Sequence, residues 1–132
     1  WGGNMTLLIN RLGTNDALIT KDIILFLEDV DEYLYSFERN MMHMYESGMF
    51  KNIKGLVIGE LSDFKDQDIP FGKNTDEIVM DICGDLDIPI ISNFPCGHGK
   101  YQCTIPLSLS VELNATNKPY IEILETAVQK ET

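Results

Sequence analysis

Five consecutive apolar residues at positions 23–27, Ile-Ile-Leu-Phe-Leu, constrain the fold of this chain more than any other feature of its sequence. A run of this length suits a strand that is buried on both faces, and it is too short for a buried helix of ordinary length. The run leads directly to Glu28. A carboxylate at the C-terminal end of a buried strand lies where open α/β sheets usually form their sites. Because burying a carboxylate without a partner is costly, we expect Glu28 to face a polar group from elsewhere in the chain.

The remaining patterns predict a single small α/β domain with a mixed sheet. Besides residues 23–27, strands are expected at 55–59, 88–91, 105–112 and 120–124, the last two as an antiparallel hairpin around residues 114–118. Apolar residues at helical spacing predict helices over residues 5–12, about 32–47 and about 75–85. The second helix is expected to bury Leu34, Phe37, Met41, Met44 and Tyr45, and to leave Arg39 and His43 in solvent. Residues 61–73 and 93–102 are expected to be loops.

Capping residues mark where these helices begin. Asn4 is placed to cap the first helix, Asp29 and Glu32 have the spacing of a capping box for the second, and Asn74 or Thr75 suits the third. A functional role for Asn4 is an alternative, because the two preceding glycines allow the backbone to approach a ligand closely. The sequence favours the cap.

The composition excludes several classes of partner. The chain has 132 residues, which fits one domain, and its 21 acidic and 10 basic residues give a formal charge of −11. This charge repels the phosphate backbone of nucleic acids and anionic lipid headgroups, and no apolar run approaches the ~18 residues of a membrane span. No nucleic-acid or membrane partner is expected. The three cysteines are an odd number, which predicts free thiols and a reducing compartment.

His98 is the strongest candidate for chemistry. It is one of two histidines and lies between Gly97 and Gly99, in a loop that is expected to follow a buried strand. Flanking glycines leave space around the imidazole ring. Glu28 and His98 are expected to leave the ends of neighbouring strands, so the carboxylate could hold Nδ1 and leave Nε2 free for proton transfer. This pair lacks only a nucleophile.

The sequence offers no convincing nucleophile or metal site to complete the pair. Cys96 is a weak candidate nucleophile, because a catalytic cysteine normally faces a histidine remote in sequence. Cys96, His98 and Cys103 resemble part of a zinc site, but their spacing is unusual and a fourth ligand is missing. None of the six serines lies in a Gly-x-Ser-x-Gly elbow. An acidic loop at residues 63–68 fails the calcium-loop spacing. We therefore expect neither a metal nor a cofactor.

Several motifs together resemble the C-terminal domain of LD-carboxypeptidases, the serine peptidase family S66, which includes the microcin-immunity peptidases. The matching segments run in order over almost the whole chain: Trp-Gly-Gly-Asn at residues 1–4, Ile-Leu-Phe-Leu-Glu-Asp-Val at 24–30 with Glu32, Glu38-Arg39 followed by Met41, Ser47-Gly48, and Gly-His-Gly at 97–99.

This resemblance implies the fold of the family's swivelling β/β/α domain and a cytoplasmic hydrolase with a Ser-Glu-His triad. Glu28 and His98 match the triad Glu and His, whereas the serine of the family belongs to an N-terminal domain that is absent from residues 1–132. Gly3 and Asn4 match a glycine and an asparagine that lie by the substrate cleft. The implied substrate is a murein tetrapeptide that loses its terminal D-alanine in peptidoglycan recycling.

Two other functions remain open at this point. One is a microcin-immunity peptidase of the same family, and the other is a non-catalytic binding or interaction domain in which Glu28 and His98 form a buried polar pair. The resemblance also implies the family's N-terminal domain and a second copy in a homodimer as partners. The isolated chain is expected to lack peptidase activity.

Overall fold

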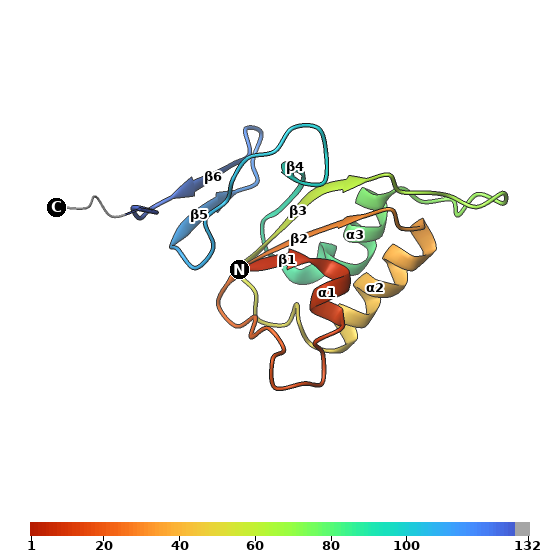
Figure 1. The fold of residues 1–132 in the computed structure, drawn as a ribbon, viewed down its shortest axis with the longest axis horizontal. Helices are drawn as coiled ribbons and strands as arrows, with labels where there is room; N and C mark the ends of the chain where they lie inside the picture. The colour runs from red at the N-terminus through yellow and green to blue at the C-terminus, as the bar shows by residue number, and fades with distance from the viewer. Residues whose placement is uncertain (129–132) are drawn as a thin grey trace.

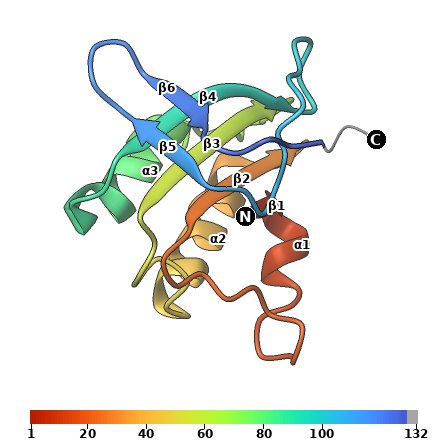
Figure 2. The same cartoon turned by 90° about the vertical axis from the view of Figure 1, so that its left-hand side faces the viewer.

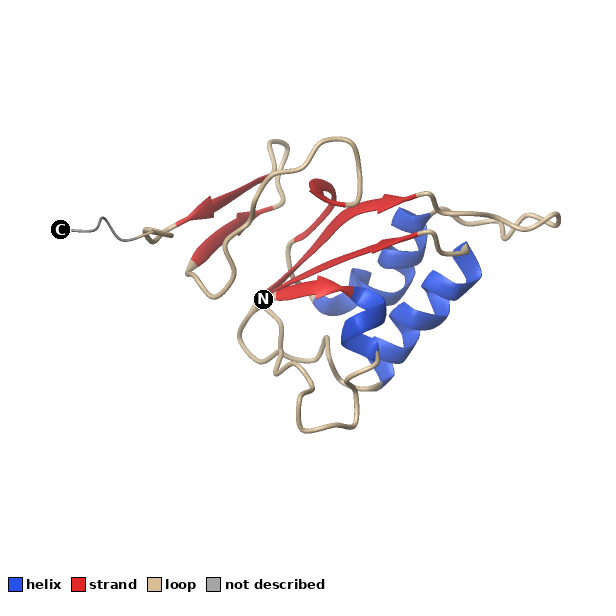
Figure 3. Cartoon of the chain, viewed as in Figure 1, coloured by secondary structure: helices blue, strands red, loops and turns tan. Residues whose placement is uncertain are grey.

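A parallel four-stranded sheet forms the centre of the structure, a computed structural model that describes residues 1–128. Its strands lie in the order in which the chain forms them: β1 (Gly2–Asn4), β2 (Ile24–Val30), β3 (Gly55–Ser62) and β4 (Ile90–Gly97). Between them come helices α1 (Met5–Ile9), α2 (Leu34–Glu46) and α3 (Thr75–Cys83) and a 3₁₀ helix, η1 (Gly84–Leu86). Crossovers between parallel strands are right-handed, so this strand order puts all the helices on one face of the sheet (Figures 1 and 3).

The hydrophobic core lies between that face and the helices. Alternate residues of the central strands, Leu25 and Leu27 in β2 and Leu56 and Ile58 in β3, point into it. They meet a buried stripe of the helices that contains Phe37, Met41 and Met44 from α2 and Ile78, Val79 and Cys83 from α3. The core thereby fixes β2 and β3 side by side, which holds the strand ends in place.

An antiparallel hairpin lies against the other face of the sheet. Its strands are β5 (Val111–Asn114) and β6 (Tyr120–Ile123), and Figure 2 shows it in front of the sheet with the helices behind. Phe26 and Val57 line a small pocket with Ile105 and Leu109 of the segment that leads into the hairpin and with Val111 of β5. Glu28 is on the same face as Phe26, because the two residues are two positions apart in one strand.

The predicted α/β class and the C-terminal hairpin are confirmed, and the structure pairs β2 with β3 in parallel. Two of the predicted segments were wrong, and one strand was not predicted. Residues 105–110 do not form a strand, residues 93–97 belong to β4 and not to a loop, and residues 2–4 form β1. β1 is held by pairing with β2, where Gly2 lies beside Phe26 and Asn4 beside Glu28. None of these three features is visible in local periodicity.

The predicted caps of α1 and α3 are confirmed, and the predicted cap of α2 was wrong. Asn4 caps α1 by accepting a hydrogen bond from the Leu7 amide at 3.1 Å, and α1 ends at Ile9, three residues early. Asn74 forms a capping box with Glu77 at the start of α3. Asp29, however, lies inside β2, and α2 begins after Tyr33 without a side-chain cap.

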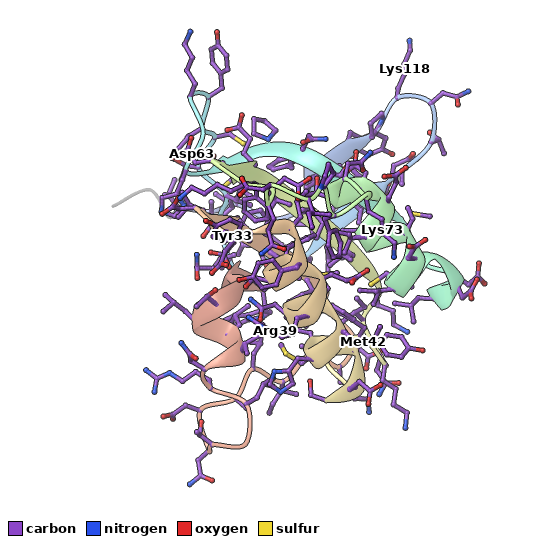
Figure 4. All side chains as sticks on the ribbon, turned by 90° about the vertical axis from the view of Figure 1, so that its right-hand side faces the viewer. Tyr33, Arg39, Met42, Asp63, Lys73 and Lys118 are labelled. Carbon is purple, nitrogen blue, oxygen red and sulfur yellow. The ribbon has the colours of Figure 1, made fainter. Side chains whose placement is uncertain are left out.

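The outer face of α2 is exposed to solvent. Figure 4 looks onto this face and labels Arg39 and Met42, and the predicted exposure of Arg39 and His43 is confirmed. Tyr45 was assigned to the buried stripe but is 47% exposed. Lys73 bridges α2 and α3 through ion pairs of 2.9 Å each, with Glu38 and with Asp81.

No helix within residues 1–128 combines the length and the apolar character that a membrane crossing requires.

Candidate active site

Glu28 of β2 and His98, which directly follows β4, meet at the C-terminal edge of the parallel sheet. The Glu28 side chain is only 9% exposed, and its Oε2 lies 2.7 Å from Nδ1 of His98. The His98 side chain is 53% exposed. The predicted contact between these residues is therefore present, with the carboxylate buried and the imidazole open to solvent.

The hydrogen bond determines which ring nitrogen is available. A carboxylate only accepts hydrogen bonds, so Nδ1 of His98 carries the hydrogen and donates it to Glu28. Nε2 is then the nitrogen with a free lone pair, and it can accept a proton from a group that approaches from the solvent side. The arrangement suits a general base held in one tautomer by a buried acid.

Glu28 and His98 were expected to leave the ends of neighbouring strands. This expectation was wrong, because β3 lies between β2 and β4. Gly59 of β3 makes their contact possible. A Cβ atom at Gly59 would overlap the carbonyl oxygen of Cys96 and lie 3.1 Å from Cβ of Glu28. A side chain at this position would therefore occupy the space through which the carboxylate reaches across the sheet.

Gly97 is the second glycine that allows the contact between Glu28 and His98. Its φ of +142° is rarely adopted by residues with a side chain, and a Cβ atom there would lie 3.3 Å from Oε2 of Glu28 and 3.0 Å from the Glu60 carbonyl oxygen. The glycine before His98 thus lets the chain leave β4 directly above the carboxylate. In the sequence, glycines 97 and 99 suggested space around the ring, but the importance of Gly59 was missed.

Asp29 is the second buried carboxylate of β2 and holds the N-terminal segment against the sheet. Oδ1 accepts hydrogen bonds from Asn4 Nδ2 and the Val30 amide at 3.0 Å each, and Oδ2 accepts from the Thr6 amide at 3.1 Å and the Thr6 hydroxyl at 2.8 Å. Asp29 is 3% exposed. These four hydrogen bonds explain why the expected capping box does not form.

Gly3 and Asn4, the predicted substrate contacts, lie beside Glu28 on β1. Asn4 is paired with Glu28, and Gly3 with Leu27. The side chain of Asn4 is already engaged, because its oxygen caps α1 and its nitrogen donates to Asp29. A Cβ atom at Gly3 would meet no atom within 4 Å, so open space adjoins the backbone there.

Glu60 was missed by the sequence analysis. Its Oε2 is buried and has no hydrogen-bond partner among the described residues, and the carboxylate fills the space that a Cβ atom of Gly99 would take. The signal that identified Glu28 also applies to Glu60, since both carboxylates follow an apolar run in a buried strand.

The cysteines do not complete the site. All three are free thiols, and burial raises the pKa of Cys96, with further contributions from nearby Cys103 and Glu28. A raised pKa leaves less of the thiolate that would act as nucleophile. Within residues 1–128, no cluster of three His, Cys, Asp or Glu side chains is arranged to hold a metal ion.

Comparison with known proteins identifies the family. The model of the LD-carboxypeptidase C-terminal domain matches residues 1–113. The chain belongs to this family. The resemblance seen in the motifs is thereby confirmed over most of the sequence.

Named relatives agree with this assignment. A putative carboxypeptidase of Synechocystis sp. is 30% identical over 115 residues, which are 85% of this chain and 37% of the relative. A murein tetrapeptide carboxypeptidase of Pseudomonas aeruginosa is 28% identical over 99 residues, or 74% of this chain and 32% of that protein. The chain thus spans about a third of the length of these relatives.

Solved structures of the family share the fold. The crystal structure of muramoyltetrapeptide carboxypeptidase from Oxalobacter formigenes superposes with a TM-score of 0.80 at 34% identity, covering 93% of this chain and 44% of that one. The microcin C7 self-immunity protein MccF, in complex with glutamyl sulfamoyl guanosine, gives a TM-score of 0.84 at 22% identity and covers 97% and 38%. At that identity, the likeness to MccF shows the fold alone.

Proposed function

We propose that this LD-carboxypeptidase domain supplies the Glu and His of a Ser-Glu-His triad that removes the terminal D-alanine from murein tetrapeptides in the cytoplasm. One observation carries the proposal. The buried carboxylate of Glu28 holds Nδ1 of an exposed His98, which is the arrangement that a general base requires.

The nucleophilic serine comes from an N-terminal domain of the same protein. In support, the matching family is a C-terminal domain, and the relatives are longer than this chain. None of the hydrogen bonds that join His98 to other described residues involves a serine. The triad is therefore completed only when the two domains meet.

The names of the relatives support a murein tetrapeptide as the substrate. Proteins from Pseudomonas aeruginosa and Oxalobacter formigenes are named for this class of peptide and are 28% and 34% identical to the chain. Gly3 contributes its backbone to the substrate cleft, and the open space beside it leaves room for a ligand. Asn4 contributes its remaining amide hydrogen, because its other side-chain groups are engaged.

The reaction follows the logic of acyl transfer. His98 Nε2 takes the proton of the serine hydroxyl as the serine attacks the carbonyl carbon of the L,D peptide bond. Glu28 stabilises the imidazolium and keeps the ring in place. His98 then gives the proton to the departing amine of D-alanine, and water hydrolyses the acyl-enzyme with His98 again as base.

The test is kinetic and uses the full-length protein with a murein tetrapeptide. Glu28→Gln should keep the fold and lower kcat by about 10⁴, the loss found when a triad acid becomes an amide. His98→Ala should be at least as damaging, and the double variant little worse, because residues that act as a unit are not additive. His43→Ala, on the exposed face of α2, is the matched control.

Near-normal kcat in both single variants would refute the triad and favour a non-catalytic binding domain. The 132-residue chain alone should be inactive, and turnover that disappears with Cys96→Ser would instead support a cysteine enzyme.

A homodimer is the assembly that the family resemblance implies, and sedimentation of the full-length protein tests it.

A further inference from the structure

Cys96 and Cys103 enclose the loop that carries His98. Cys96 lies in β4, and the chain turns back so that Cys103 returns to the same strand. The Cys103 amide donates to the Pro95 carbonyl oxygen at 2.7 Å, and the Cys103 thiol donates to the same oxygen at 3.0 Å. Pro95 and Cys96 share a peptide group, so both ends of the loop meet at this point.

These contacts bring the two cysteines within the range of a disulfide. With standard peptide dimensions, the hydrogen-bonded path through the Pro95 carbonyl places the two Cα atoms at most about 7 Å apart. Disulfides span Cα separations of roughly 4.4–6.8 Å.

We propose that Cys96 and Cys103 form a reversible disulfide that closes the His98 loop when a low-molecular-weight disulfide, such as oxidised glutathione, is present. The pair would then be a redox-sensitive modification site next to the triad. Its effect on turnover rests on the function proposed above, whereas formation of the bond does not.

The reaction proceeds by two thiol–disulfide exchanges. Cys103 is exposed, so its thiolate attacks one sulfur of the small disulfide, forms a mixed disulfide and releases one small thiol. The Cys96 thiolate then attacks Sγ of Cys103 and releases the second small thiol. The two cysteines are oxidised, the small disulfide is reduced to two thiols, and their sulfurs take up the two cysteine protons. Because burial raises the pKa of Cys96, the second exchange should accelerate with rising pH.

The bond would act on His98 because Cys96 has little freedom to move. Its carbonyl oxygen packs against Gly59 of β3, and Gly97 is wedged between Glu28 and the Glu60 backbone. Closing the disulfide therefore draws Cys103 and the exposed loop toward the sheet. His98 belongs to that loop, so the geometry of its hydrogen bond to Glu28 changes and kcat falls in the oxidised enzyme.

Trypsin provides a direct test on the 132-residue chain, because Lys100 lies inside the loop. After incubation with oxidised glutathione, the peptides on the two sides of Lys100 should remain joined under non-reducing conditions and separate after reduction. Cys96→Ser and Cys103→Ser should each stop at a glutathione adduct on the other cysteine of this pair. Stable glutathione adducts on both Cys96 and Cys103 of the wild type, without joined peptides, would overturn the proposal.

The histidine resonances separate bond formation from its consequence. The chain has two histidines, and His43 on α2 serves as an internal reference for His98. Oxidation should shift the His98 ring signal and leave that of His43 in place. Joined peptides with an unchanged His98 signal would refute the effect on the site.

In the full-length enzyme, oxidised glutathione should lower kcat at least 10-fold, and reduction should restore it. The double variant Cys96→Ser/Cys103→Ser, which can form neither the disulfide nor an adduct on this pair, should keep its kcat under the same treatment. An enzyme that carries the disulfide and keeps its full kcat would refute the regulatory part. Failure of the triad itself would appear separately, as normal turnover of the reduced Glu28→Gln variant.

Discussion

Replacing Asp29 by Asn is expected to destabilise the domain strongly, although the two side chains have nearly the same shape. Each carboxylate oxygen of Asp29 accepts two hydrogen bonds. An asparagine has one oxygen and one NH₂ group, so in either orientation the NH₂ group faces two donors. With the NH₂ group turned toward Thr6, the Thr6 hydroxyl can accept a hydrogen bond from it, but the Thr6 amide loses its acceptor. Asp29→Asn therefore leaves at least one buried donor unpaired.

The size of the effect follows from burial. Asp29 is 3% exposed, so water cannot replace the lost acceptor. A buried donor without a partner costs about 1–3 kcal/mol, which predicts a loss of about that size for the unpaired Thr6 amide. Small domains unfold at a cost of only about 5–15 kcal/mol, so the variant should retain much less of its stability.

Urea denaturation of the 132-residue chain, followed by circular dichroism, measures this loss. Asp66→Asn is the matched control, because Asp66 also accepts backbone hydrogen bonds, from Gln67 and Phe71, but is exposed. The control should lose less than about 1 kcal/mol, since water can take over its hydrogen bonds. An equal and small loss in both variants would show that Asp29 does not hold β1 and α1 against the sheet.

Two further predictions concern the packing around the site. Gly59→Ala should separate β4 from β3 and cost about 1–3 kcal/mol or more, because the new methyl group overlaps the Cys96 carbonyl, whereas Gly84→Ala, whose Cβ would approach only Met80, should cost little. Hydrogen exchange of the β4 amides distinguishes them, and unchanged protection in Gly59→Ala would contradict the close approach. Burial raises the pKa of Cys83 to about 12, so the folded state holds this proton more tightly than the unfolded state does. Relative to Cys83→Ala, the wild type should therefore lose about 1.4 kcal/mol of unfolding free energy per pH unit as the pH rises from about 9 toward 12. Urea titrations at several pH values measure this, and the same dependence of the unfolding free energy on pH in both proteins would contradict it.

The elements predicted correctly depend on residues that are close together in the chain. The apolar runs at 23–27 and 55–59 predict strands, and Asn74 with Glu77 forms the capping box that their spacing indicates. In each case, the groups that interact lie within one turn or one strand. Local sequence therefore contains most of the information that these elements need.

The elements predicted wrongly depend on distant partners. The segment Gly-Gly-Asn has no strand propensity and becomes β1 only by pairing with β2. Residues 105–110 alternate like a strand, but in the structure several of them line the pocket beside Phe26 and do not extend the hairpin. Asp29 has the spacing of a helix cap and instead binds Asn4 and Thr6, because burial favours the larger number of hydrogen bonds.

The candidate site shows the same division. The sequence by itself determined that Glu28 ends an apolar run, that His98 lies between glycines, and that both match the motifs of a family. Only the tertiary structure decided that a strand separates them and that Gly59 leaves the space for their contact. The two residues are 70 positions apart, so their 2.7 Å hydrogen bond depends on strand order and register, which the core packing of the whole sheet fixes and no local pattern records.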